Sequence, residues 1–322
     1  MGDAFTQQSS LASDTTAYQI QAYFQLRPLL HFDAVADVKP TNQSHRGAAV
    51  QFNIYDELTA QVTALSETAD PDAIAAGDDT VTLTLVEQGA LMKTTAKLRA
   101  TSFLGISNDM ANLVGYNAGL SLDSLAGAKL EAGINVVYSD DATARDEVDN
   151  DAGARLSANT IRQVVANLRS DNVRPSVGNY FRGFIHPDVA FDLMSTTGEA
   201  GWLQPHVYSA AENVWSGEIG ALAGVSFIQT PRAPLFADAG DGAGNVGDID
   251  VYGTIICGQQ ALALAHADSE GYGRYPSIVL GPKVDGLQRI QPIGWKWLGC
   301  YGIFRQQSVR RVESSSSIGD NA

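Results

Sequence analysis

The residue pair best suited to acid–base chemistry is His186 and Asp188, two positions apart in Ile185-His186-Pro187-Asp188. A carboxylate beside an imidazole can orient the ring to take a proton from a substrate, as general base catalysis requires. The same residues also suit the beginning of a helix, because Pro187 has the backbone angle of a first helical turn and its missing N–H is not needed there. We favour the helix start and keep a hydrolase that uses His186 and Asp188 as the enzymatic alternative.

Other catalytic and cofactor motifs are not supported. The histidines lack the HExxH spacing of a zinc protease: His31, His45, His186, His206 and His266. The glycine-rich segment 240–244 has no helix signal after it, which makes a dinucleotide site a poor interpretation, and no serine lies in a GxSxG turn. The sequence therefore predicts no catalytic residue, no cofactor-binding residue and no metal ligand, and the protein is not expected to be an enzyme.

The acidic segment from Asp238 to Asp250 is the one place where calcium chemistry is worth weighing. It contains Asp238, Asp241, Asn245, Asp248 and Asp250, and closely spaced oxygen ligands can hold calcium. The order of an EF-hand and its terminal glutamate are missing, so a solvated surface loop is the favoured interpretation. A calcium-binding surface-layer or adhesin module is the alternative.

Basic residues gather near the end of an otherwise acidic chain, at Arg305, Arg310 and Arg311. They could meet acidic loops of adjacent subunits or bound DNA, or they could be ordinary solvated charges on strands. Both interpretations remain open from the sequence.

The composition limits the classes of partner. The chain has 322 residues and a net charge of -15, which argues against wrapping nucleic acid or binding an anionic membrane. Only 18% of residues are charged, as expected if other chains cover much of the surface, although a globular protein with a Ser- and Asn-rich exterior would look similar. Cys257 and Cys300 lie in apolar runs, which predicts buried reduced thiols and folding in a cytosol.

Hydrophobic patterning predicts separate helices and strands without a repeating βαβ order, so we expect an α+β fold. Strands are expected at 50–55 and 80–86, joined as a long hairpin that lacks a core of its own and needs a neighbouring subunit. Helices are expected at 106–132, from Ser157 to Asp171-Asn172, from Pro187, and at 259–267. The remaining elements are strands at 180–185, 225–229, 251–257, 278–280, 287–290, 295–304 and 308–312, with a loop at 237–248.

An ordered series of short motifs resembles one known family. After the strand and the His186-Pro187-Asp188 helix start come Trp202, Gly217-Glu218-Ile219-Gly220, Gly224-Val225 and Thr230-Pro231, and later Gly294-Trp295-Lys296. This order resembles tailed-phage major capsid proteins of the Hong-Kong-ninety-seven type, in particular the phage N-four-like capsid subgroup. The resemblance covers about 25–313.

The resemblance implies a division of the chain into regions. Residues 1–48 resemble the N-terminal arm, 49–98 the extended β-hairpin loop that lies over a neighbour, and 99–179 the peripheral domain with its spine helix at 106–132. Residues 180–275 resemble the axial domain, and 276–313 resemble strands that return to the peripheral domain. We expect the tail, 314–322, to be disordered.

The resemblance also implies a function. It implies a structural protein of the virion that assembles with itself into hexamers and pentamers of an icosahedral phage head around double-stranded DNA. A separate scaffolding protein, a portal and decoration proteins are the further expected partners, the host cytoplasm is the expected place of assembly, and no membrane is involved. An encapsulin-like nanocompartment shell protein, which has the same fold, is the alternative.

Overall fold

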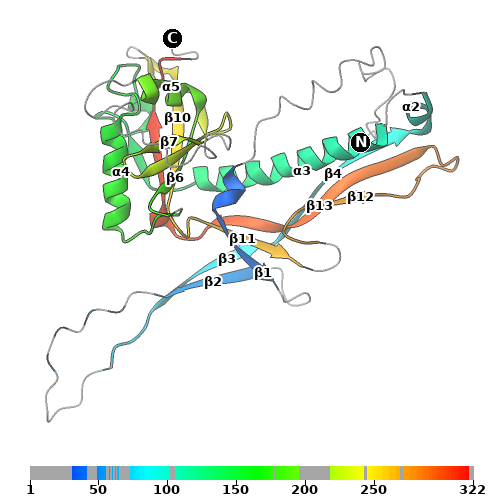
Figure 1. Ribbon diagram of the computed structural model, residues 1–322, viewed down its shortest axis with the longest axis horizontal. Coiled ribbons are helices and arrows are strands. Elements are labelled where there is room, and N and C mark those ends of the chain that lie inside the picture. Colours follow the sequence, from blue (N-terminus) through cyan, green and yellow to red (C-terminus); the bar gives the residue numbers. More distant parts are fainter. Residues whose placement is uncertain are drawn as a thin grey trace.

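The molecule consists of two sheet-and-helix halves and a projecting hairpin (Figure 1). The computed structural model describes residues 31–41, 49–55, 58, 60, 62, 64, 73–101, 106–176, 178–195, 218–242, 245–268 and 272–318. Helices and strands are mixed without βαβ alternation, so the predicted α+β class is confirmed.

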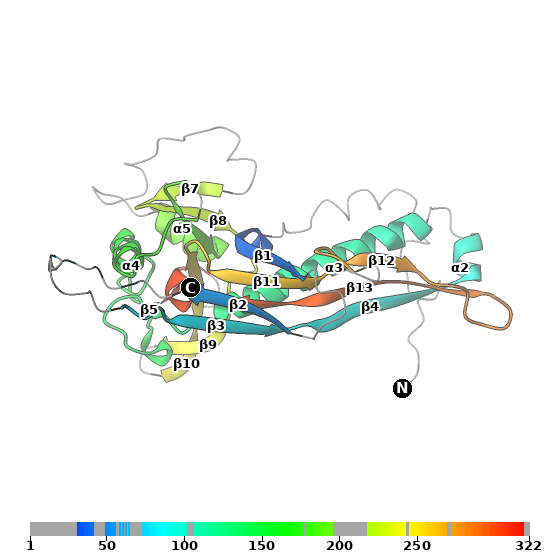
Figure 2. The ribbon, with the colours of Figure 1, turned by 90° about the horizontal axis from the view of Figure 1, so that it is seen from below.

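The first half is an elongated sheet along the long helix α3 (Ile106–Glu131), which confirms the helix expected at 106–132. We call it the α3 sheet; its strands are β1 (Ala36–Thr41), β11 (Leu262–Ala267), β13 (Ile290–Ile303), β12 (Ser277–Leu280) and β4 (Val86–Thr95). Figure 2 shows α3 running beside β4, β12 and β13. The short helix α2 (Ala96–Thr101) follows β4.

The spacing of apolar residues explains why α3 packs on this sheet. Every fourth residue is buried: Met110, Val114, Ala118, Leu122, Ala126 and Leu130. This stripe meets Trp295 and Trp297 of β13 in one core. The indole N–H of Trp295 donates to Asn117 Oδ1 at 2.9 Å, so the buried ring keeps its hydrogen bond.

The second half is a sheet covered on both faces. We call it the α4–α5 sheet; its strands are β5 (Val136–Tyr138), β14 (Val309–Ser314), β10 (Asn245–Cys257), β6 (Phe181–Ile185), β8 (Val225–Gln229), β7 (Glu218–Leu222) and β9 (Leu235–Gly242). Phe181 and Ile185 of β6 pack with α4 (Ala158–Ser170) and α5 (Pro187–Ser195), whereas Phe184 packs with α3. Because neighbouring residues face opposite covered sides, these strands lack polar alternation.

The ends of α4 match the sequence prediction. Ser157 Oγ accepts the Thr160 N–H at 3.2 Å, which is the expected N-cap. Asp171 is the C-cap, and Asn172 follows with a positive φ of 57°, a conformation that ends helices.

A buried turn of the arm joins the two halves. The short 3₁₀ turn η3 (Phe32–Val35) places the ring of Phe32 4.8 Å from that of Phe184 on the α4–α5 sheet. The same ring lies against Gly127 of α3, where an added Cβ would stand 3.2 Å from it. Phe32 is only 1% exposed, so the arm enters the common core at this point.

The predicted hairpin is formed by β2 (Ala49–Tyr55) and β3 (Asp78–Thr84), which pair antiparallel along their whole length. Its root is better supported than expected, because Phe52 and Leu83 pack against Ala263 and Ala265 of β11. The Phe52 ring also lies 5.4 Å from that of Phe304. The hairpin is therefore anchored in its own subunit, and its strands β2 and β3 extend away from both halves (Figure 1).

Three local predictions are wrong. Residues 287–290 were expected to form a strand, but they lie in a turn up to Ile290, the first residue of β13. Residues 259–267 were expected to form a helix but contain β11, whose residues are all buried between β1 and β13. A strand without a polar face has no alternation to distinguish it from a buried helix. Residues 237–248 were expected to form a loop but lie mostly in β9 and β10, which pair with register shifts that break the usual pattern.

The predicted division into arm, loop and domains stays a prediction, while the sheets group the elements as follows. The segment β4 belongs to the α3 sheet and not to the hairpin, while α4 and β14 belong to the α4–α5 sheet and not to the α3 half. The tail predicted to be disordered begins with Ser314, Ser315 and Ser316, which are fully buried. Asp192 of α5 accepts hydrogen bonds from the Ser316 hydroxyl at 2.9 Å and the Ser317 N–H at 2.8 Å.

The substitution Phe32→Ala tests the joint between the halves. Removing this buried ring should lower the free energy of unfolding by about 3–5 kcal/mol, because a cavity remains between α3 and β6. The matched control is Phe191→Ala on α5, whose side chain is 53% exposed and should cost much less. Chemical denaturation followed by circular dichroism measures both; equal losses would contradict the assigned role of Phe32.

Candidate functional site

The pair His186 and Asp188 lies at the start of α5, where the sequence places it. His186 Nδ1 accepts the Asp188 N–H at 3.3 Å, and the His186 carbonyl accepts the Ala190 N–H at 2.9 Å. These bonds satisfy groups of the first helical turn, as capping requires. The Asp188 carboxylate in turn accepts the Tyr252 hydroxyl at 3.0 Å.

The electrostatics of this pair fit a structural role. Burial lowers the pKa of His186, and the nearby Asp188 carboxylate, 3.2 Å from Nδ1, opposes that shift. A neutral ring can accept the backbone N–H, whereas a protonated ring cannot. The ring also packs 5.0 Å from that of Tyr252. The arrangement holds α5 on β10, so its bonds are accounted for without a substrate.

The three arginines near the end of the chain hold helix ends of the same subunit. Arg310 pairs with the side chain of Asp171, and Arg305 donates to the Asp171 carbonyl at 3.1 Å, both at the end of α4. Arg311 donates to the Glu131 carbonyl at the end of α3. Cations are stabilised at helix C-termini by the helix dipole. These contacts within the subunit go beyond ordinary solvated charges, whereas contact with acidic loops of adjacent subunits or with bound DNA stays a prediction.

Glu313 forms a buried network that the sequence does not reveal. Arg145 holds this fully buried carboxylate with two hydrogen bonds of 2.8 Å, and Arg311 adds one of 2.7 Å. The Arg145 guanidinium also lies 3.4 Å from the ring centroid of Phe236. Arg145 and Glu313 are 168 positions apart, so no local pattern could have indicated the pair.

Asp123 is the second buried carboxylate that the sequence prediction missed. It lies on α3, accepts the Phe32 N–H at 2.7 Å, and pairs with Arg232 Nη2 at 2.7 Å. Burial raises its pKa, while Arg232 and the backbone N–H groups of η3 oppose that shift. An aspartate inside an apolar helical stripe is the signal that could have marked it.

The proposed calcium segment does not form a ligand cluster in the part of the chain that is described. Asp250 Oδ1 accepts the Asp238 N–H at 3.0 Å across the β9–β10 pair. Among the described residues no group of three or more His, Cys, Asp or Glu side chains converges in a way that could hold a metal ion.

The two cysteines carry free thiols. Cys257 is fully buried and burial raises its pKa to about 12, while Cys300 is half-buried and its pKa is raised by the same cause. A thiol with a raised pKa is a weak nucleophile at neutral pH. The expectation of buried reduced thiols is confirmed for Cys257 and holds in part for Cys300. Of the described helices, not one combines the length and apolarity needed to cross a membrane.

Among the described residues, exposed apolar side chains gather mainly in two places. One is the hairpin and the segment beyond it, with Tyr55, Leu58, Val62 and Ile74. The other is the far end of the α3 sheet and the loop after β12, with Leu91, Ile278, Val279, Leu280, Val284 and Leu287. Exposed apolar groups gathered in this way mark surfaces that other chains cover.

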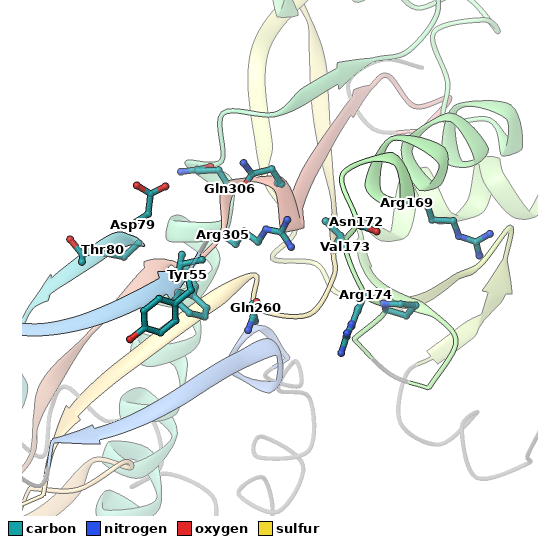
Figure 3. Close-up of a pocket in the computed structure, with 15 residues that line it drawn as sticks. Tyr55, Asp79, Thr80, Arg169, Asn172, Val173, Arg174, Gln260, Arg305 and Gln306 are labelled. Carbon is teal, nitrogen blue, oxygen red and sulfur yellow. The ribbon is translucent and has the colours of Figure 1, made fainter. Parts of the chain in front are cut away.

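A groove of about 1000 Å³ opens between the loop-side end of the β2–β3 pair and the end of α4. Figure 3 shows Tyr55 and Asp79 on the hairpin side and Arg169 and Arg174 on the α4 side, with Arg305 between them. The lining is mostly polar and three of its residues are arginines. The described surface thus offers exposed apolar and charged faces that suit binding to other proteins.

The comparison with protein families identifies the role of these exposed surfaces. The model of the family described as phage capsid protein matches residues 30–311. The chain belongs to the phage capsid protein family. The capsid protein is therefore a structural protein of the virion, with the role of a major capsid protein.

Solved phage capsids have the same fold. The capsid of Ralstonia phage GP4 matches with a TM-score of 0.69 and 15% identity over 92% of this chain and 91% of that one. The head of Helicobacter pylori bacteriophage KHP40 matches with a TM-score of 0.65 and 14% identity, over 89% and 88%. The cyanophage Pam1 capsid matches with a TM-score of 0.61 and 15% identity, over 99% and 100%. No curated protein matches the capsid protein by sequence, and the N-four-like subgroup stays a prediction.

The substitution His186→Ala tests the capping role. At pH 7.5 it should lower the free energy of unfolding by about 0.5–2 kcal/mol, as loss of a cap does. Because burial lowers the folded-state pKa of His186, the unfolded chain binds the proton first as the pH falls below 6.5. The wild type therefore loses this stabilisation on acidification, and the difference between wild type and variant should shrink between pH 7.5 and pH 5. Denaturation curves across this range measure it, and a difference that grows toward low pH would contradict the assignment.

Proposed function

We propose that the capsid protein assembles with itself into hexamers and pentamers that close an icosahedral phage head around double-stranded DNA. The observation that carries the proposal is the hairpin, which is anchored at Phe52 and Leu83 yet presents apolar side chains beyond its own core. Val62 is 91% exposed, and an apolar side chain in such a position gains about 1.5–3 kcal/mol when a partner buries it. A rigid root with an apolar outer part is suited to covering a neighbouring copy.

The two halves have different proposed places in the shell. The α3 sheet corresponds to the peripheral domain, with α3 as its spine helix, and the α4–α5 sheet corresponds to the axial domain around the five- and six-fold axes. The exposed apolar end of the α3 sheet is a surface on which the hairpin of another copy can rest. Head-to-tail contacts of this kind generate closed rings when the rotation between subunits closes.

The net charge of the chain supports a role in a shell that contains DNA without binding it. With a net charge of -15 and arginines used at helix ends, the subunit offers little for adhesion to phosphate. DNA driven in by a motor does not need an adhesive wall, and an acidic lining would avoid trapping it. A head of this kind needs a portal, and we propose a separate scaffolding protein and decoration proteins as further partners, with assembly in the host cytoplasm.

A non-enzymatic role fits the site that most resembled catalytic machinery. His186 and Asp188 are engaged in capping α5 and in holding Tyr252. The match to a phage capsid family supports a phage head over an encapsulin-like compartment.

Assembly of the purified chain tests the proposal directly. Negative-stain electron microscopy with light scattering should show closed shells, or rings of five and six subunits. The same trial with and without a scaffolding protein tests the need for one. Strictly monomeric protein under every salt and concentration condition, also with the scaffolding protein present, would overturn the proposal.

The double substitution Leu58→Ser with Val62→Ser tests the hairpin as a contact. It removes two exposed apolar groups from each subunit, so we expect an unchanged circular dichroism spectrum and about tenfold or greater loss of assembly, since each 1.4 kcal/mol of contact energy is worth a factor of ten. The matched control is Ile134→Ser, which removes an apolar side chain that is 73% exposed in the turn after α3. Unimpaired assembly of the double variant would contradict the assignment, as would an equal loss in the control.

A further inference from the structure

The groove beside the hairpin differs from the other assembly surfaces in its chemistry. Its walls come from the hairpin, the end of α4 and the segment between β13 and β14, and it encloses about 1000 Å³. The apolar end of the α3 sheet can bury aliphatic groups, whereas this groove offers guanidinium groups at Arg169, Arg174 and Arg305 (Figure 3). A partner for the groove must therefore bring negative charge.

The arginines of the α4 wall are available for such a partner. Elsewhere in the subunit, arginines pair with carboxylates of the same chain, as Arg145, Arg232, Arg274, Arg289, Arg310 and Arg311 do. Within the described residues Arg169 and Arg174 form no such pair, and both are exposed. Asp79, on the hairpin wall, is the one carboxylate in the lining. The groove therefore has more positive than negative charge on an acidic subunit.

A second copy of the chain is the partner that fits this charge. Each copy has 36 acidic and 21 basic side chains, so its surface supplies carboxylates in excess. Position supports the same partner, because one wall of the groove is the hairpin that we propose to cover a neighbour. If the hairpin covers a neighbouring copy, a surface segment of that copy enters the groove and contacts the end of α4.

We propose that this groove seats an acidic segment of the adjacent subunit and that Arg169 and Arg174 recognise its carboxylates. The inference rests on the proposed self-assembly and adds the chemistry of one contact. Guanidinium groups bind carboxylates through two parallel hydrogen bonds, which fixes orientation as well as distance. The contact thus sets the register between neighbouring subunits, while the apolar hairpin contributes the buried apolar surface.

Charge reversal tests the proposal. The double variant Arg169→Glu with Arg174→Glu places like charges opposite the incoming carboxylates, and we expect half-assembly to require about tenfold or more protein than the wild type. Circular dichroism and thermal melting should show a folded subunit, since both side chains are exposed and without a partner in the described structure.

The matched control is Arg162→Glu. Arg162 lies on the same helix, two turns before Arg169, is exposed, and does not line the groove. It should assemble nearly as the wild type does. Equal loss in the control would show an effect of total charge and would overturn the assignment to the groove, as would normal assembly of the double variant.

Zero-length crosslinking tests the identity of the partner. The variant Arg174→Lys keeps the positive charge and introduces an amine into a groove whose lining has none. Assembled from a mixture of ¹⁵N-labelled and unlabelled copies and treated with the carbodiimide EDC, it should give a peptide that joins this amine to an Asp or Glu of another copy. A crosslink only to Asp79 of the same copy, or none in assembled particles, would overturn the proposal.

These outcomes separate the contact from self-assembly itself. If the wild type forms shells or rings and the double variant does too, the groove contact is wrong and the proposed function stands. If the wild type never assembles, the proposed function fails before the variants are compared.

Discussion

The buried carboxylate of Asp123 is the interaction on which the arrangement of the two halves depends. It lies on α3, accepts the Phe32 N–H from the arm, and pairs with Arg232, which follows the strand β8 of the α4–α5 sheet. Three segments remote in sequence thus meet at one charged group that is 2% exposed. Loss of either partner would leave a charge buried without compensation, which is far more costly than the loss of an exposed pair. The apolar contact of Phe32 with Phe184 closes the same junction, so charge and packing enforce one geometry.

Charged side chains also hold the C-terminal ends of α3 and α4. The strand β14 carries Arg310 to the end of α4 and Arg311 to the end of α3, so one strand places a cation at the C-terminus of each helix. Glu313 on the same strand then ties Arg145 and Arg311 together inside the protein. A sheet assembled from distant segments is held in register by these charged contacts, because each has specific partners and a defined direction.

Local signals in the sequence were sufficient to predict helices that have capping residues or a proline at their ends, and strands that alternate apolar and polar residues. Ser157 and Asn172 mark α4, Pro187 marks α5, and alternation marks β2. The failures have different causes: burial on both faces at 259–267, and register shifts between β9 and β10 at 237–248. The run 259–267 is apolar and alanine-rich, and only its position between β1 and β13 makes it a strand. The serines from Ser314 to Ser316 look like a disordered tail until Asp192 on α5 is known to bind Ser316 and Ser317. The pairing of His186 with a helix start was predictable, whereas Asp123 with Arg232 and Arg145 with Glu313 depend on tertiary structure.

The place of β14 has a consequence for synthesis on the ribosome. This strand lies between β5 and β10 in the α4–α5 sheet, although residues 309–314 are translated after every other strand of that sheet. Until they emerge, β5 cannot join the rest of its sheet, and the ends of α3 and α4 lack the arginines that complete them. A nascent subunit therefore cannot present a finished surface to its neighbours on the same messenger RNA. The order of the chain delays the capacity to associate until the last sheet strand has been released.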